Sequence, residues 1–463
     1  MKNTAQALGH EPIRKLVVRM STPSIIALLV HALYNVVDAI FVGRGVGTLG
    51  IAGIGVAFPT FLLMIGLAQL VSVGSASVMS RALGRGDMKT AEESMGTGIC
   101  LVAIAGISLA ILGILFGTQL MQFSGATDDA LPYAVAYITV ILGGSFPFLL
   151  SFTLSALVRA QGDALRATVP ILVAALLNIA LDPLFIFVFH MGTAGAAWAT
   201  ILAQGIGVSY LAWHLLRGKG VVRFRVRSLV LRARLVREIV GIGTSSFIRT
   251  FSSSAATVVI NRVLGVYGGD VAIAVYSIVN RLMSFARMPI FGVVDGVQPI
   301  FGYNYGARQT DRVQSTIWHG LSFAGLLTGF FWVLFLVFPK AFLGLFSTDV
   351  ALIARGATAL RWIALAIPLF AVQAIVGGLY QAIGRASHAL AISLLRGIIL
   401  IIPCVLILSH FFGTTGVWIA FSVTDVMSAL IAFAMLSIEI RRLQELGIAY
   451  QVEEADTAGN KKL

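Results

Sequence analysis

The sequence has few charged residues. Asp, Glu, Lys and Arg make up 11% of its 463 residues, and 58% of the residues are hydrophobic. Soluble globular proteins carry roughly 25% charged residues, which they need to cover a surface that faces water. This composition excludes a soluble globular protein and indicates a membrane protein that crosses the bilayer several times.

Cysteine and catalytic motifs are also scarce. The two cysteines, Cys100 and Cys404, lie in apolar stretches without a CxxC pair, which excludes a disulfide framework or a cysteine metal site. No HExxH, GxSxG or P-loop pattern occurs. The segment GVGTLG at 45–50 matches GxGxxG, but it joins two apolar runs without a preceding strand and is interpreted as a turn. We therefore expect no enzymatic activity and no cofactor, and the polar, basic N-terminal stretch does not resemble a cleavable signal peptide.

Apolar runs of membrane-spanning length are abundant. Twelve of them satisfy the requirement of about 20 residues for a transmembrane helix. They predict an all-α membrane protein with twelve transmembrane helices, at residues 21–42, 52–80, 95–118, 132–158, 167–189, 195–216, 239–261, 271–302, 315–338, 352–382, 389–411 and 415–438.

Basic residues fall mainly on one side of these spans. If the N-terminus is inside, 24 of the 33 Lys and Arg residues face the cytoplasm and 4 face outside. This predicts a multi-pass protein of the cell (inner) membrane with both termini in the cytoplasm. The segment 217–237 holds eight basic residues and no acid. A nucleic-acid arm is the alternative, but a loop against anionic membrane lipids explains it better, so no nucleic-acid partner is expected.

The two halves of the chain form an internal repeat. LGRGD at 83–87 corresponds to YGARQ at 305–309, and Gly74 and Gly296 have the same spacing of 222 residues. GTAGAAWA at 192–199 matches GTTGVWIA at 413–420. Six spans in each half return the second half in the same orientation, so a pseudo-two-fold axis along the membrane normal is expected. The predicted domains are an N-terminal lobe at 1–220, a basic linker at 221–237 and a C-terminal lobe at 238–463.

Two acids lie inside predicted spans of the first half. A charged group at this depth costs roughly 2.5–3.5 kcal/mol, so Asp38 and Asp182 mark a functional site by default. Tyr34 precedes Asp38 by four residues and Asn178 precedes Asp182 by four, which places each pair on one helical face. Two carboxylates at one depth repel unless a proton or cation joins them. The alternatives are an interfacial Asp38 and two acids that point into separate wet crevices.

The second half lacks both acids. A shift of 222 residues carries Asp38 onto Ile260 and Asp182 onto Cys404, so the expected site is asymmetric. Asp295, in the predicted eighth span, either pairs with an arginine or meets a cationic ligand. The other charged residues within spans are Arg249, Arg281, Arg287, Arg361, Arg396 and Asp425.

The chain resembles the multidrug and toxic compound extrusion (MATE) family over nearly its whole length. The resemblance is carried by LYNVVDAIFVGR at 33–44, LGRGD, NIALDPLFIF at 178–187, GTAGAAWAT at 192–200 and QPIFGYNYGA at 298–307. It is strongest to the DinF and archaeal branch, in which an N-lobe site couples transport to sodium or protons. Family members commonly carry glutamine at the position of Asp295. The resemblance implies a coupling site formed by Tyr34, Asp38, Asn178, Asp182 and Thr200.

The resulting functional hypothesis is a secondary antiporter. It would export amphipathic, cationic organic compounds in exchange for Na⁺ or H⁺, with any Na⁺ held by Asp38, Asn178, Asp182 and Thr200, and no other metal site is expected. The alternative is a lipid-linked oligosaccharide flippase, which would need a cationic cavity for a pyrophosphate. An ion channel is disfavoured because the acids form no symmetric ring. The expected partners are small amphipathic substrates and membrane lipids, and the expected state is a monomer.

Overall fold

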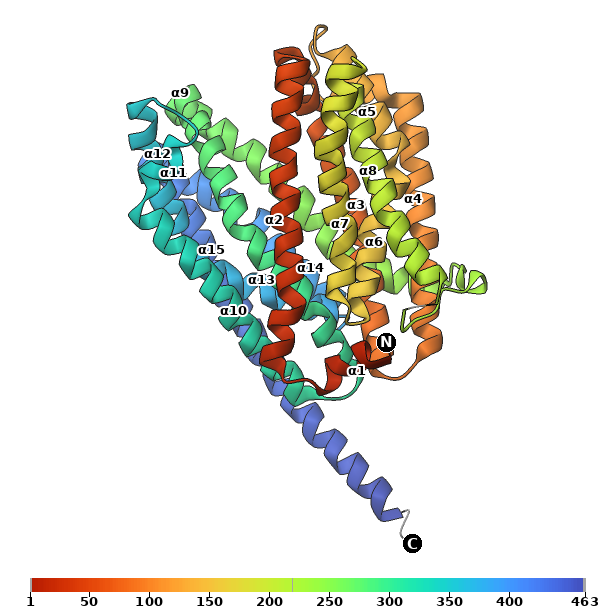
Figure 1. Ribbon diagram of the computed structural model, residues 1–463. Coiled ribbons are helices and arrows are strands. Elements are labelled where there is room, and N and C mark those ends of the chain that lie inside the picture. Colours follow the sequence, from red (N-terminus) through yellow and green to blue (C-terminus); the bar gives the residue numbers. More distant parts are fainter. Residues whose placement is uncertain (1, 219, 461–463) are drawn as a thin grey trace. The chain divides into compact units, whose positions relative to one another are not determined.

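The computed structural model describes residues 2–218 and 220–460, and these residues form helices joined by short connections (Figure 1). Lys219, Lys461 and Lys462, which contribute to the predicted charge asymmetry, lie outside the described residues. The helices of the first half are α1 (Lys2–His10), α2 (Ile13–Gly45), α3 (Thr48–Gly84), α4 (Met88–Phe123), α5 (Leu131–Gly143), α6 (Ser145–Ala160), α7 (Ala164–Pro183), the π-helix η1 (Leu184–Val188), α8 (Gly192–Leu216) and the short 3₁₀ turn η2 (Val226–Ser228).

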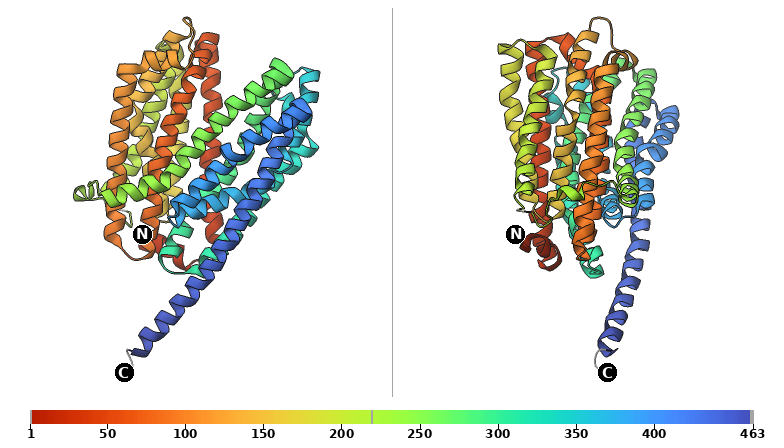
Figure 2. Two further views of the ribbon diagram at one scale, coloured as in Figure 1. Left: turned by 180° about the vertical axis from the view of Figure 1, so that it is seen from behind. Right: turned by 90° about the vertical axis from the view of Figure 1, so that its right-hand side faces the viewer.

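The second half is helical in the same way. Its helices are α9 (Ala233–Gly306), α10 (Thr310–Val337), α11 (Pro339–Gly344), α12 (Val350–Ala364), α13 (Ile367–Ala382), α14 (Ala386–Leu394), the π-helix η3 (Leu395–Leu400) and α15 (Ile401–Asn460). The last part of α15 continues past the other helices of this half as a single helix (Figure 2).

Twelve spanning segments can be counted in the described residues once the breaks are considered. Eight helices are long and apolar enough to cross a membrane, and two bent pairs, α5 with α6 and α12 with α13, each make a further span. α9 and α15 each contain one residue with non-helical backbone angles, Gly269 and Gly413, which divides them in two. The prediction of an all-α fold with twelve spans is confirmed.

The backbone repeats with the spacing found in the sequence. Residues with positive φ angles recur 222 or 221 positions apart in four pairs, which are Gly47 and Gly269, Gly86 and Arg308, Gly162 and Gly384, and Gly192 and Gly413. Positive φ is strained for residues with a Cβ atom, so it marks turns that the fold requires. The internal repeat is therefore a repeat of turns as well as of sequence.

The chain forms two compact units whose limits lie inside helices. Unit 1 comprises residues 1–7 and 26–251, and unit 2 comprises 8–25 and 252–463. The first part of α2 thus belongs to unit 2, and the first part of α9 belongs to unit 1. The lobes predicted at 1–220 and 238–463 have other limits because two helices are each shared between the units.

Two glycines at repeat-related positions lie where the shared helices α2 and α9 pack closely against other helices. In unit 1, a Cβ atom on Gly74 would lie 2.1 Å from the backbone oxygen of Ile239 in α9. In unit 2, a Cβ atom on Gly296 would lie 2.6 Å from Cα of Ser21 in α2. Both distances are too short for any side chain, so only glycine allows these helices to approach so closely. The repeated spacing of Gly74 and Gly296 reflects this packing.

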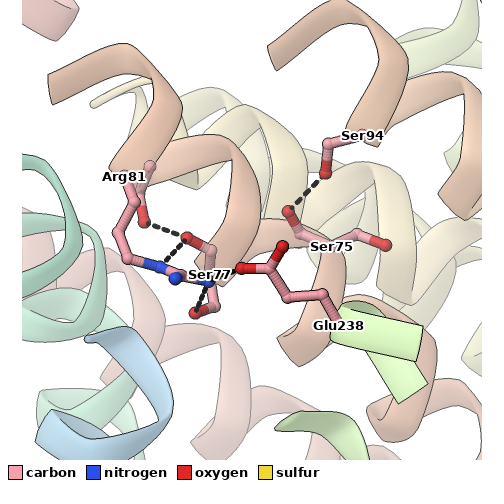
Figure 3. A network of polar contacts seen from close by, with 6 residues as sticks. Ser75, Ser77, Arg81, Ser94 and Glu238 are labelled. Carbon is pink, nitrogen blue, oxygen red and sulfur yellow. Dashed lines mark hydrogen bonds and ion pairs between the residues drawn. The ribbon is translucent and has the colours of Figure 1, made fainter. Parts of the chain in front are cut away.

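The segment between the halves is attached to unit 1 by polar contacts. The Thr97 hydroxyl donates to the Val230 carbonyl at 2.9 Å, and Arg232 pairs with Glu93 at 2.7 Å. At the start of α9, Glu238 pairs with Arg81 of α3 at 2.9 Å (Figure 3). Arg81 also donates from Nε to the carbonyl of Ser77 at 3.2 Å. These contacts hold the basic segment and the first part of α9 against α3 and α4.

Candidate cation site

Unit 1 brings the two predicted acids together. Asp38 of α2 and Asp182 of α7 lie within hydrogen-bonding reach of one another. Asp182 is fully buried, and Oδ1 of Asp38 is covered without any hydrogen-bond partner. Two ionised carboxylates repel at this separation, so the arrangement requires a shared proton or a bound cation. The alternative of two separate wet crevices does not fit this geometry.

Asn178 and Thr200 complete one wall of the site. The amide of Asn178 lies between Asp182 and Thr200, and all three side chains are buried. In the orientation that satisfies both ends of the amide, its nitrogen donates to Oδ2 of Asp182 at 3.2 Å, and its oxygen accepts from the Thr200 hydroxyl at 3.3 Å. The spacing of four residues places Asn178 and Asp182 on one face of α7, as the sequence predicts.

The helix that carries Asp182 changes its geometry directly after this residue. α7 ends at Pro183, and the π-helix η1 follows, in which Phe189 donates its backbone N–H to the Leu184 carbonyl at 3.0 Å. Proline provides no N–H for the regular helical bond, which favours such a break. π-helical turns occur frequently at functional sites, because they alter the direction of nearby side chains.

Two tyrosines lie beside the acids. Tyr34 is buried, its ring packs edge-on against His31 with 4.8 Å between ring centroids, and it interacts electrostatically with Asp38 and Asp182. Tyr137 of α5 is buried and interacts with the same two carboxyl groups. The sequence analysis missed Tyr137, because an isolated tyrosine in an apolar span has no acid at helical spacing to reveal its role.

The remaining candidates lie in unit 2. Asp295 is half-buried on α9, belongs to unit 2 and has an interaction of its own. Ile260, the repeat counterpart of Asp38, is buried in the apolar core of unit 2, and Cys404, the counterpart of Asp182, packs against that core. The acid site therefore has no copy at the corresponding positions of the second repeat.

A protein family and its curated members match this chain over most of its length. The MatE family model matches residues 23–184 and 245–407, two segments whose starts are separated by the repeat spacing. Multidrug export protein MepA of Staphylococcus aureus (strain NCTC 8325 / PS 47) is 27% identical over 429 residues, which is 92% of this chain and 94% of that protein.

Solved structures also match this chain over most of its length. A crystal structure of MATE in complex with MaL6 superposes with a TM-score of 0.91 at 26% identity and covers 96% of this chain and 99% of that one. An outward-facing multidrug resistance MATE family transporter of the MOP superfamily gives a TM-score of 0.90 at 25% identity, with coverage of 96% and 99%. With both repeats matched and the twelve-helix architecture shared, the chain belongs to the MatE family of multidrug export transporters.

Proposed function

We propose that this transporter is a cation-coupled antiporter that exports amphipathic organic cations. The coupling ion, Na⁺ or H⁺, binds in unit 1 at Asp38, Asn178, Asp182 and Thr200, with Tyr34 beside them. The single observation that carries the proposal is the contact between two carboxyl groups, one with a covered oxygen that lacks a donor. A proton or a sodium ion supplies the missing partner and removes the repulsion.

Coupling follows if the ion and the substrate prefer different conformations. A gradient drives export only when the ion binds the two states of the transporter with different affinity. Substrate and ion then weaken one another reciprocally, because the coupling free energy is the same for both. The π-helix after Asp182 and the turn between α2 and α3 are where we expect the backbone to adjust.

In the DinF and archaeal branch the coupling site lies in the N-lobe, and the acid pair of this chain lies in the first repeat alone. On that basis we assign the chain to this branch. The flippase alternative is not favoured, because the relatives that match this chain over more than nine-tenths of its length are multidrug export proteins.

The test is dye efflux from proteoliposomes that contain the purified protein. A cationic dye is loaded inside, and an inward gradient of Na⁺ or of H⁺ is imposed separately. We expect one gradient to accelerate efflux and a liposome without protein to show no response. Equal efflux with and without both gradients would refute coupling.

A further inference from the structure

Unit 2 contains a buried cluster of charges outside the acid pair. Arg287 lies in α9, Arg396 in the π-helix η3 and Asp425 in α15. Nε of Arg396 donates to Oδ1 of Asp425 at 2.6 Å, and Asp425 is almost fully buried. Arg287 interacts electrostatically with Arg396, with Asp425 and with Tyr276. Two guanidinium groups thus share one carboxylate.

Both arginines lie over the same aromatic ring. The guanidinium carbon of Arg396 is 5.0 Å from the centroid of Phe370, and that of Arg287 is 5.3 Å from it. Phe291 packs edge-on against this ring with 5.8 Å between centroids, which fixes its orientation. Cation–π contacts stabilise a guanidinium group but do not neutralise its charge. The ring holds the two like charges in place although they repel one another.

Arg287 offers an unused binding edge. Its Nε and Nη2 are covered and have no hydrogen-bond partner. These two N–H groups lie along one edge of the guanidinium group, within its plane, where they match the two oxygens of a carboxylate. Oδ2 of Asp425 also lacks a partner, but a bond between it and Arg287 would still leave one positive charge uncompensated. An uncompensated charge is costly in a buried site at membrane depth.

Among the described residues, Asp425 is the one acid that interacts electrostatically with Arg287. Asp295 follows Arg287 by eight residues on α9, a rise of about 12 Å. Glu439 pairs with Arg385 at 2.6 Å. The π-helix η3, which carries Arg396, is a second indication of a site, because π-helical turns occur frequently at functional sites.

We propose that Arg287, with Arg396 and the face of Phe370, forms an anion site that receives the carboxylate of an amphipathic aromatic substrate. The site deepens the proposed export function by adding a substrate class, organic acids with an aromatic body. Arg287 is partly exposed as a residue, and presenting its covered Nε and Nη2 to a ligand requires a rotation of the side chain. The aromatic body of such a ligand packs against Phe291, which is partly exposed.

The test compares two dyes that differ only in this group. Rhodamine 110 carries a free carboxyl group, and rhodamine 123 is its methyl ester. Binding to the purified full-length protein is measured by fluorescence anisotropy at pH 7.5 without any ion gradient. We expect Arg287→Gln to weaken binding of rhodamine 110 by about tenfold, the loss for one bidentate charged contact, and binding of rhodamine 123 by less than about twofold.

Arg281→Gln is the matched control, because Arg281 lies on the same helix but is exposed. It should change neither affinity. If Arg287→Gln does not yield a monodisperse protein, Arg287→Lys retains the charge without the fork and should weaken the acid by a few fold while sparing the ester. Equal losses for both dyes, or no loss for either, would overturn the proposal.

The same titration distinguishes a carboxylate from a phosphate. Sodium pyrophosphate should not displace rhodamine 110 at equal concentration. Displacement that depends on Arg287 would assign the site to a phosphate headgroup and overturn the substrate proposal. Because no gradient is used, failure here leaves the coupling scheme intact, and failure of gradient-driven efflux leaves this binding result intact.

Discussion

Asp38 and Asp182 are acids in the first repeat, whereas their counterparts in the second are Ile260 and Cys404. The two copies of the repeat thus share their turns, but the first copy alone carries acids at these two positions. A neutral substitution at either acid keeps nearly the same shape but removes the capacity to exchange a proton or to balance a cation. Substitution of these two acids therefore tests whether the coupling site lies in the first repeat alone.

We expect Asp38→Asn and Asp182→Asn each to reduce gradient-driven dye efflux by at least about tenfold, because each removes a charged partner of the coupling ion. The measurement is initial efflux rate in proteoliposomes with protein amounts matched. Cys404→Ser is the control at the repeat-related position and should retain most of the rate. Full activity in both acid variants would remove the unit 1 site from the mechanism.

At the scale of elements, the repeat is maintained by turns and caps. Gly47, between α2 and α3, has a φ of 87° with no atom near its missing Cβ. A side chain there costs backbone strain alone, roughly 1–3 kcal/mol. We expect Gly47→Ala to lower the free energy of unfolding in detergent by about 1 kcal/mol.

Gly55 provides the comparison for this substitution. It lies within α3 and also has open space around its missing Cβ. Alanine at Gly55 should be neutral or stabilising, because a helix favours alanine over glycine by up to about 1 kcal/mol. Equal effects of the two substitutions would show that the positive φ at Gly47 does not disfavour a side chain.

The N-terminus of α4 is capped by a carboxylate. Asp87 accepts a hydrogen bond from the backbone N–H of Thr90 at 3.0 Å, and hydrogen bonds from Thr90 lower the pKa of the Asp87 carboxyl in the folded protein. A lowered pKa gives stability that is fully present above the unfolded value near 3.9 and is lost as pH falls through the folded value. Asp87→Ala should cost about 1 kcal/mol at pH 7 and less at pH 3.

The repeat supplies the control for the cap. Gln309 occupies the corresponding position before α10 and makes no side-chain cap bond. Gln309→Ala should have the same effect on unfolding at both pH values, measured in the same detergent. A cost of Asp87→Ala that does not change with pH would exclude a role for the ionised carboxylate.

The sequence predicts the regular parts of the fold and misses contacts between distant helices. Hydrophobic length places twelve spans, and the spacing of 222 residues appears again in the positive φ angles of Gly47 and Gly269. Helical periodicity pairs Asn178 with Asp182, since both lie on one helix. It does not show that Arg287 and Arg396 lie over Phe370, because their helices are far apart in sequence and nothing local encodes their register.

At the scale of the whole molecule, the charge pattern predicts orientation. The segment 217–237 should face the cytoplasm, because basic loops resist translocation. Val226 is 74% exposed, so a cysteine there is accessible, whereas Ser228 is buried. In a variant without Cys100 and Cys404, Val226→Cys should react with a membrane-impermeant maleimide only after cells are permeabilised.

A cysteine at Val350, which is 80% exposed and lies in a predicted external connection, is the opposite control. It should be labelled in intact cells. Labelling of Val226→Cys from outside together with protection of Val350→Cys would reverse the orientation of the entire chain and place both termini outside.

During translation, residues 8–25 emerge long before residues 252–463, with which they form unit 2. Residues 8–25 are therefore inserted before the helices against which they pack have been synthesised. Conversely, unit 1 is complete only after the first part of α9 has been synthesised. Neither half of the chain therefore contains all the residues of its own unit. A chain released after α8 contains residues 8–25 without the rest of unit 2, and cellular quality control can recognise the uncovered surface of this segment.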